Sequence, residues 1–198
     1  GQNRYISMKE FAPNTYKLIK TNTEFYGLVE PTTALVRTDE NGFILPKGNE
    51  GMTNKKNKKI IFLGGSTTEA YRVNEQNRFP YLVAKKLNEK YFDKNVSFES
   101  LNSGLSGIHS MHSNLNLLTK GIEESPEIAV MMHNINDIAI LIHEKSYFND
   151  NSTRSLIDNL GYYDVAEKIG KDFLPYFTEA FFNPVWRIYL SLISKNDE

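Results

Sequence analysis

The chain has 198 residues, of which 40% are hydrophobic and 12% aromatic, so it is long enough to bury one domain core. Its net charge of −1 excludes the strongly basic surface that nucleic-acid binding requires, and we expect no nucleic-acid partner. No cysteine is present, which excludes disulfide and thiolate chemistry. No apolar run reaches the roughly 20 residues of a membrane span, so we expect none in this chain.

Residues 1–58 are predicted to form a β-containing extension and a linker. They carry short apolar pieces, such as 34–36 and 43–45, between polar residues and prolines. The pair Asn41-Gly42 favours the positive backbone angles of a tight turn, so we expect a small β-hairpin there. The polar stretch 48–58 is typical of a connector.

From residue 59 onward, strand patterns alternate with helix patterns, which predicts an α/β domain over 59–198 with helices on both faces of a parallel sheet. The third strand is a continuous apolar run of the kind buried on both faces. The predicted strands are 60–63, 96–101 and 128–132, and the predicted helices are 79–92, 110–122, 137–143, a segment near 163–173 and another near 184–193, with a loop at 149–155.

The first strand stops at Gly64-Gly65 and is followed by Ser66-Thr67-Thr68-Glu69. Such a turn can present the Ser66 hydroxyl beside free backbone N–H groups, as a nucleophile for acyl transfer requires. The same residues fit a capping box, with Ser66 and Glu69 satisfying the start of a helix. A glycine-rich turn after a strand also suits a phosphate anion. The turn alone leaves these three interpretations open.

Two further polar segments, 102–107 and 134–137, follow the second and third strands. Loops after the carboxyl ends of parallel strands meet at one edge of the sheet, so we expect Ser66, Gly107 and Asn136 to lie together. The N–H groups of Ser66 and Gly107 and the side-chain amide of Asn136 could then donate to one oxyanion. Taken singly, the glycines suit an ordinary turn, and Asn136-Asp137 suits a helix N-cap.

Together, Gly64–Glu69, Asn102–Gly107 and Asn134–Asp137 resemble the first three blocks of the SGNH (GDSL-type) hydrolases, over about residues 59–142. The resemblance implies a three-layer α/β/α, flavodoxin-like parallel sheet. It implies Ser66 as nucleophile and Gly107 and Asn136 as oxyanion donors, with no metal or other cofactor. Gly65 stands where the family often has aspartate, and Asn134 replaces a glycine. The expected substrate-binding residues are Gly65, Thr67, Gly104, His133 and Asn134.

The stretch 39–43 also resembles the lead-in of SGNH proteins encoded with surface-polysaccharide genes. This resemblance implies a serine esterase that acts on O-acetyl groups of a carbohydrate, or an acetyltransferase, in the bacterial cytoplasm or cell envelope. The alternative is a non-catalytic carbohydrate-binding or assembly module that keeps the crevice. A phosphate-binding flavodoxin-like domain is a third possibility.

The general base is missing from the family pattern, because the chain has no Asp-x-x-His and no histidine after His143. His109 and His112 are expected on a surface or helix face, and His133 is expected to shape the pocket. A serine without a base is a poor nucleophile at neutral pH. We therefore expect a fragment that lacks the last two strands, an enzyme completed elsewhere, or an inactive relative.

An open edge and an apolar segment favour association. Strand order 2-1-3 would leave the third strand unpaired on one side, and residues 181–193 are strongly apolar. We therefore expect self-association or a second chain that completes the sheet.

Overall fold

The computed structural model describes residues 5–6, 8–20, 33–52, 54–148 and 156–158. The chain divides into two compact units, one over residues 6–156 and one that joins 1–5 to 157–198. The short strands β1 (Tyr5–Ile6) and β7 (Ile157–Asp158) pair with each other. The loop predicted at 149–155, the helices predicted near 163–173 and 184–193, and the apolar run 181–193 all lie outside the described residues. The proposed boundary after residue 58 stays a prediction.

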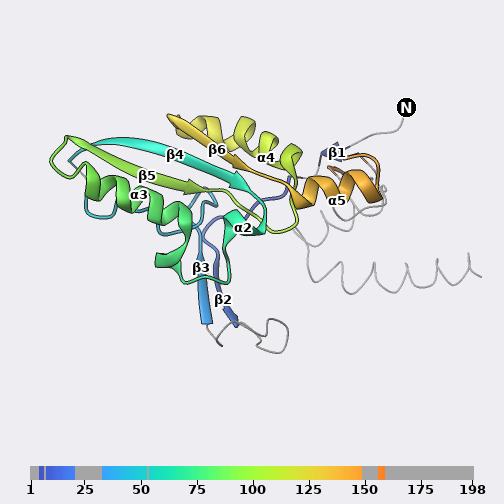
Figure 1. The fold of residues 1–198 in the computed structure, drawn as a ribbon, viewed down its shortest axis with the longest axis horizontal. Helices are drawn as coiled ribbons and strands as arrows, with labels where there is room; N and C mark the ends of the chain where they lie inside the picture. The colour runs from blue at the N-terminus through green and yellow to red at the C-terminus, as the bar shows by residue number, and fades with distance from the viewer. Residues whose placement is uncertain (1–4, 7, 21–32, 53, 149–155, 159–198) are drawn as a thin grey trace, which may run out of the picture. The chain divides into compact units, whose positions relative to one another are not determined.

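A three-stranded parallel sheet forms the centre of the larger unit, in the order β5-β4-β6 (Figure 1). The strands are β4 (Lys56–Gly64), β5 (Val96–Asn102) and β6 (Ile128–Met132). The alternation of strand and helix patterns therefore predicted the α/β class and the parallel pairing correctly. Because all three strands run in one direction, the segments that follow Gly64, Asn102 and Met132 emerge at the same edge.

Successive side chains of β4 point to opposite faces of the sheet, and helical segments pack against both faces. On one face Ile61 and Leu63 pack in a buried cluster with Phe43 and Leu101, with Leu117 against it. On the other face the ring of Phe62 meets Phe79 edge-on, at 5.7 Å between centroids. Phe79 begins α3 (Phe79–Lys90), and Leu117 follows α4 (Ser110–Asn116) in the π-helical turn η2 (Leu117–Gly121), before η3 (Ile122–Glu124). Helical segments thus lie against both faces of the parallel sheet, as an α/β fold requires.

The predicted burial of β6 on both faces is wrong. Ile128 is 52% exposed, Met131 41% and Met132 44%. Among the described strands β6 pairs only with β4, which confirms the expected order 2-1-3 and the open edge of its third strand. The exposed apolar surface continues onto α5 (Ile135–His143). We call the following residues the β6–α5 apolar face: Ile128, Met131, Met132, Ile135, Ile138, Leu141 and Ile142.

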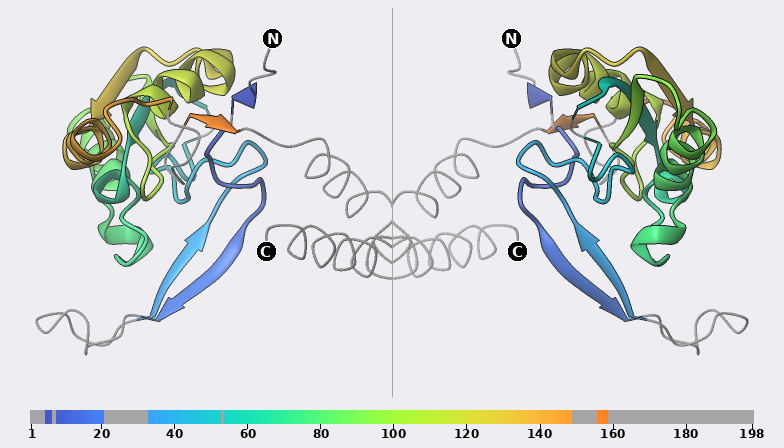
Figure 2. Two further views of the ribbon diagram at one scale, coloured as in Figure 1. Left: turned by 90° about the vertical axis from the view of Figure 1, so that its right-hand side faces the viewer. Right: turned by 90° about the vertical axis from the view of Figure 1, so that its left-hand side faces the viewer.

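The N-terminal part of the larger unit holds an antiparallel pair, β2 (Tyr16–Lys20) and β3 (Thr33–Arg37), which extends as a two-stranded ribbon (Figure 2). The turn expected at Asn41-Gly42 is present, with Gly42 at a φ of 77°. It closes with one antiparallel bridge, Thr38 to Ile44, rather than a longer ladder. Ile44 also bridges to Asn102 of β5, which joins this segment to the sheet.

A buried arginine connects the N-terminal part to the end of α2 (Ser66–Glu69). The side chain of Arg78 is 1% exposed, and its guanidinium donates to the backbone carbonyls of Leu35, Leu45 and Ala70. Burial lowers the pKa of Arg78, and nearby carboxylates oppose that effect. Because each carbonyl belongs to a different segment, Arg78 holds β3, the 45–46 turn and the residue after α2 together. No helix in the described part of the chain is long and apolar enough to cross a membrane.

Candidate active site

The serine turn follows β4 directly, and α2 starts at Ser66. Gly65 is the residue before the helix, and its carbonyl accepts the backbone N–H groups of Thr68 and Glu69 at 3.0 Å. No side-chain hydrogen bond caps α2, so the capping-box interpretation is wrong. The turn exposes Ser66 and Thr67 and buries the next two residues, because one side of this single helical turn faces the protein.

Glu69 turns away from the helix start and bonds to the second polar segment. Its carboxylate accepts the hydroxyl of Ser106, and burial raises the pKa of Glu69 although this bond opposes the shift. A Cβ at Gly104 would lie 2.4 Å from the backbone nitrogen of Glu69, so only glycine fits there. Asn102 donates to the carbonyl of Thr68 at 3.1 Å. The second polar segment therefore packs against the serine turn and is bonded to it. Gly104 has a packing role, because its lack of a side chain lets the two segments come close.

Asn136 lies against the backbone of the serine turn. Its side-chain Nδ2 donates to the carbonyl of Ile108 at 2.7 Å. A Cβ at Gly65 would lie 2.7 Å from the same nitrogen, so the missing side chain at Gly65 is what lets the amide approach the backbone before Ser66. The N-cap interpretation of Asn136 is wrong, because α5 begins at Ile135 and its N-cap is Asn134.

The loop that carries Gly107 is bonded to both other segments. The N–H of Leu105 donates to the carbonyl of Gly64 at 3.0 Å, and the carbonyl of Ile108 accepts Asn136. Gly107 has a φ of +80°, and a Cβ there would meet nothing within 4 Å. Glycine is therefore favoured at this position by backbone conformation rather than by space. The three segments meet at one edge of the sheet, as the strand pattern predicts.

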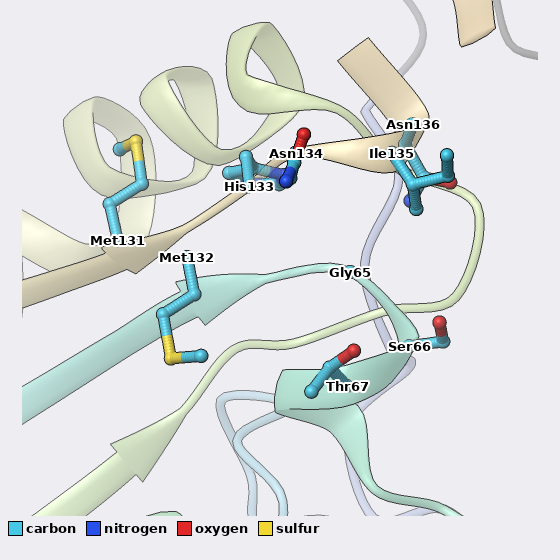
Figure 3. Close-up of a pocket in the computed structure, with 9 residues that line it drawn as sticks. All are labelled: Gly65, Ser66, Thr67, Met131, Met132, His133, Asn134, Ile135 and Asn136. Atoms are coloured by element: carbon cyan, nitrogen blue, oxygen red, sulfur yellow. The ribbon is translucent and has the colours of Figure 1, made fainter. Parts of the chain in front are cut away.

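Ser66 and Thr67 lie between two pockets of about 470 and 500 Å³. The first contains four of the expected substrate-binding residues, namely Gly65, Thr67, His133 and Asn134, and also Met131, Met132, Ile135 and Asn136. Figure 3 shows Ser66 and Asn136 at one end of this pocket and Met131 at the other. The second pocket is lined by Ala70, Tyr71, Arg72, Val73 and Ser106. Gly104 lines neither pocket.

His133 bonds to residues other than Ser66. Its Nε2 is 2.7 Å from the hydroxyl of Ser113, and its Nδ1 is 3.6 Å from a carboxylate oxygen of Asp137. Burial lowers the pKa of His133, and the charge of Asp137 opposes that effect, so the ring is neutral at neutral pH. A neutral ring with these contacts has its Nδ1 proton toward Asp137 and accepts the hydroxyl of Ser113.

Two histidines at the start of α4, His109 just before the helix and His112 within it, differ from expectation. His109 and His112 are 0% and 1% exposed, with ring centroids 4.0 Å apart, so their placement on a surface is wrong. The sequence around them is polar, and helix-face patterns give no sign of a buried pair. His143, at the end of α5, is exposed.

Asp137 is the residue that sequence reasoning missed. Its carboxylate accepts the backbone N–H of Ser110 at 3.2 Å and also the Ser110 hydroxyl, and it accepts the Tyr147 hydroxyl at 2.8 Å. Burial alone would raise the pKa of Asp137, but these bonds and nearby His133 lower it, so the carboxylate is ionised at neutral pH. The pattern Asn-x-Asn-Asp contains this residue, but no local signal links it to Ser110 or Tyr147.

No protein-family model, curated protein or solved structure matches the chain.

The chemistry of the site is therefore argued from its geometry. Within the described ranges, no group of three or more histidine, aspartate or glutamate side chains could hold a metal ion. What the site brings together is an exposed hydroxyl, a conformationally special glycine and a side-chain amide, beside a partly apolar pocket. This set can bind and polarise a carbonyl group next to a hydroxyl.

Proposed function

We propose that the protein is an SGNH-type serine hydrolase or acyltransferase that acts on an ester. The observation that carries this proposal is the close approach of the Asn136 amide to the backbone of Gly65, the residue before Ser66, in a pocket that Ser66 and Asn136 both line. The loop of Gly107 reaches the same place through the bond between Ile108 and Asn136.

In this proposal the Ser66 hydroxyl oxygen attacks the acyl carbon, and the carbonyl oxygen becomes negatively charged. The N–H groups of Ser66 and Gly107 and the amide of Asn136 stabilise that charge, and loss of one such donor typically costs about 10²–10³ in rate. The alcohol then leaves, and water or a second alcohol accepts the acyl group. The proton of Ser66 must pass to a base, and we assign that role to no residue, because Nε2 of His133 bonds to Ser113 and its Nδ1 lies 3.6 Å from Asp137.

The two pockets support an ester substrate with substantial groups on both sides. Ser66 and Thr67 are shared by both pockets, so an acyl carbon at Ser66 would have one group in each. The methionines of the first pocket suit an apolar group, and the second pocket contains Tyr71 with the guanidinium of Arg72 5.0 Å from its ring centroid. An aromatic ring suits the C–H face of a sugar and a guanidinium can donate to its hydroxyl groups, which agrees with an acylated carbohydrate.

Labelling with a fluorophosphonate tests the proposal, because an activated serine displaces fluoride to form a covalent Ser–O–P bond and places the polarised phosphoryl oxygen where the ester carbonyl oxygen would be. We expect one adduct per chain by intact-protein mass spectrometry, mapped to Ser66 by peptide sequencing. Ser66→Ala should abolish it, and the neighbouring Thr67→Ala is the matched control. An adduct that persists in Ser66→Ala, or none in the wild-type protein at pH 7–9, would refute the assignment.

A non-catalytic carbohydrate-binding module is the second candidate, and the engagement of His133 favours it. A binding module needs the pockets but neither the base nor the nucleophile. It predicts that acetylated oligosaccharides bind with equal affinity to wild type and to Ser66→Ala in titration calorimetry, while neither protein reacts with the fluorophosphonate.

A further inference from the structure

The carboxylate of Asp137 connects the beginnings of two helices that follow different strands. Asp137 lies in the first turn of α5, and its partner Ser110 is the first residue of α4. Both the backbone N–H and the hydroxyl of Ser110 donate to this carboxylate. Each helix start follows a segment of the site, since Gly107 precedes Ser110 and Asn136 precedes Asp137.

We propose that Asp137 is a positioning residue that holds the N–H of Gly107 and the amide of Asn136 at the spacing one oxyanion requires. The inference rests on the proposed function for its catalytic consequence, but not for its geometry. Among the described residues three connections join the two segments, namely the bond of Asn136 to Ile108, the bonds of Asp137 to Ser110 and the bond of His133 to Ser113. The first uses the donor itself, and the third reaches α4 beyond its first residue, so the bonds of Asp137 are the ones that can fix the start of α4 beside Gly107.

The charge of Asp137 is what makes the connection strong. Bonds to a carboxylate are roughly twice as strong as bonds between neutral groups. The Tyr147 hydroxyl adds a third donor, and the ring of His109 packs 4.7 Å from the Tyr147 ring. An amide at position 137 would keep the shape, but even with its oxygen at the Oδ1 position it would lose the negative charge, and its NH₂ group would face the N–H of Ser110. Asp137→Asn therefore weakens the connection without opening a cavity.

Hydrogen exchange measures the geometry without any catalytic assumption. In Asp137→Asn we expect the backbone amides of 107–110 to exchange about tenfold faster than in the wild type, because a bond worth about 1.4 kcal/mol is lost. The exposed Asp93, in the turn after α3, provides the matched control Asp93→Asn. Unchanged exchange at 107–110 in Asp137→Asn, with the protein folded by circular dichroism, would overturn the inference.

Labelling kinetics measure the consequence at Ser66. With a fluorophosphonate we expect Asp137→Asn to lower the maximal labelling rate about 10- to 100-fold, below the loss expected for removing a donor outright. The concentration for half-maximal rate should stay within twofold, since the pockets are unchanged. Tyr147→Phe, which removes one of the three donors, should lower the rate two- to fivefold, and the exposed Tyr16→Phe should not change it.

The two measurements separate the possible failures. If the wild-type protein is never labelled, the proposed function fails, and hydrogen exchange still decides whether Asp137 fixes the 107–110 loop. If exchange accelerates while the labelling rate is unchanged, the connection exists but does not position the donors, and the inference is wrong. If the half-maximal concentration rises while the maximal rate stays constant, Asp137 acts on binding, which also contradicts it.

Discussion

Adding a single methyl group at Gly65 should disable the site while leaving the fold intact. The Cβ of Gly65→Ala would lie 2.7 Å from Nδ2 of Asn136, whereas ordinary contact begins at 3.4 Å. The backbone at Gly65 has a φ of −82°, which alanine adopts without strain. The clash is therefore relieved at the end of a side chain, and the amide of Asn136 must retreat by about 0.7 Å.

A retreat of this size is enough to remove a donor. Oxyanion donors act within a narrow window of about 2.7–3.1 Å, and misplacement by about 1 Å can cost 10²-fold in rate. We therefore expect Gly65→Ala to lower the labelling rate of Ser66 about 100-fold. The same displacement strains the bond from Asn136 to Ile108, which is 2.7 Å long.

Gly121→Ala provides a matched control, since its Cβ would also meet the end of a side chain at 2.7 Å, here Cδ1 of Ile61 in the core. It should lower the midpoint of urea unfolding and leave labelling unchanged, while Gly65→Ala should do the reverse. Combination with Asn136→Ala gives the sharpest test, because Gly65→Ala should have no further effect once the amide is gone. Equal fold-losses in the two backgrounds would refute the reasoning.

Three further changes test other parts of the structure. Arg78→Met removes the guanidinium donor from three partly buried carbonyls and should lower the free energy of unfolding in urea by about 3 kcal/mol. A loss under about 1 kcal/mol would contradict the role of Arg78 as a connector. Burial raises the pKa of Glu69, so the protein should lose stability relative to Glu69→Gln as pH rises from 4 through that pKa, and a pH-independent difference would be inconsistent with it. Ile128→Lys on the edge strand β6 should reduce concentration-dependent association in sedimentation velocity, because a lysine on an edge strand opposes strand pairing. The control Val83→Lys on α3 should not reduce it. Equal association of the two variants would contradict association through the edge of β6.

The sheet could be predicted from the sequence because the sequence signals of its strands are local. The apolar runs that became β4, β5 and β6 are bounded by glycine or by polar residues, and the helical spacing of α3 is regular. That the segments carrying Ser66, Gly107 and Asn136 begin at one edge of the sheet followed from parallel pairing alone, because the ends of parallel strands share an edge.

What sequence reasoning could not reach depends on partners far along the chain. The hydrogen bonds of Asp137 with Ser110 and of Glu69 with Ser106 join residues 27 and 37 positions apart in the sequence. Glu69 shows the difficulty well, since its spacing from Ser66 fits a capping box, yet the carboxylate bonds across the site instead. The expected order 2-1-3 placed β6 at the edge, but the exposure of its side chains was missed, because the run Ile128–Met132 gives no information about what covers its two faces.

The bonds that join the three segments of the site have a consequence for refolding. Asn136 reaches Ile108 across 28 positions, and Asn102 reaches Thr68 across 34. Contacts this distant in sequence form only after long loops have closed, whereas helices form locally and early. During recovery from urea the helical signal should therefore return first, and reactivity at Ser66 should return only when the last strand has joined the sheet.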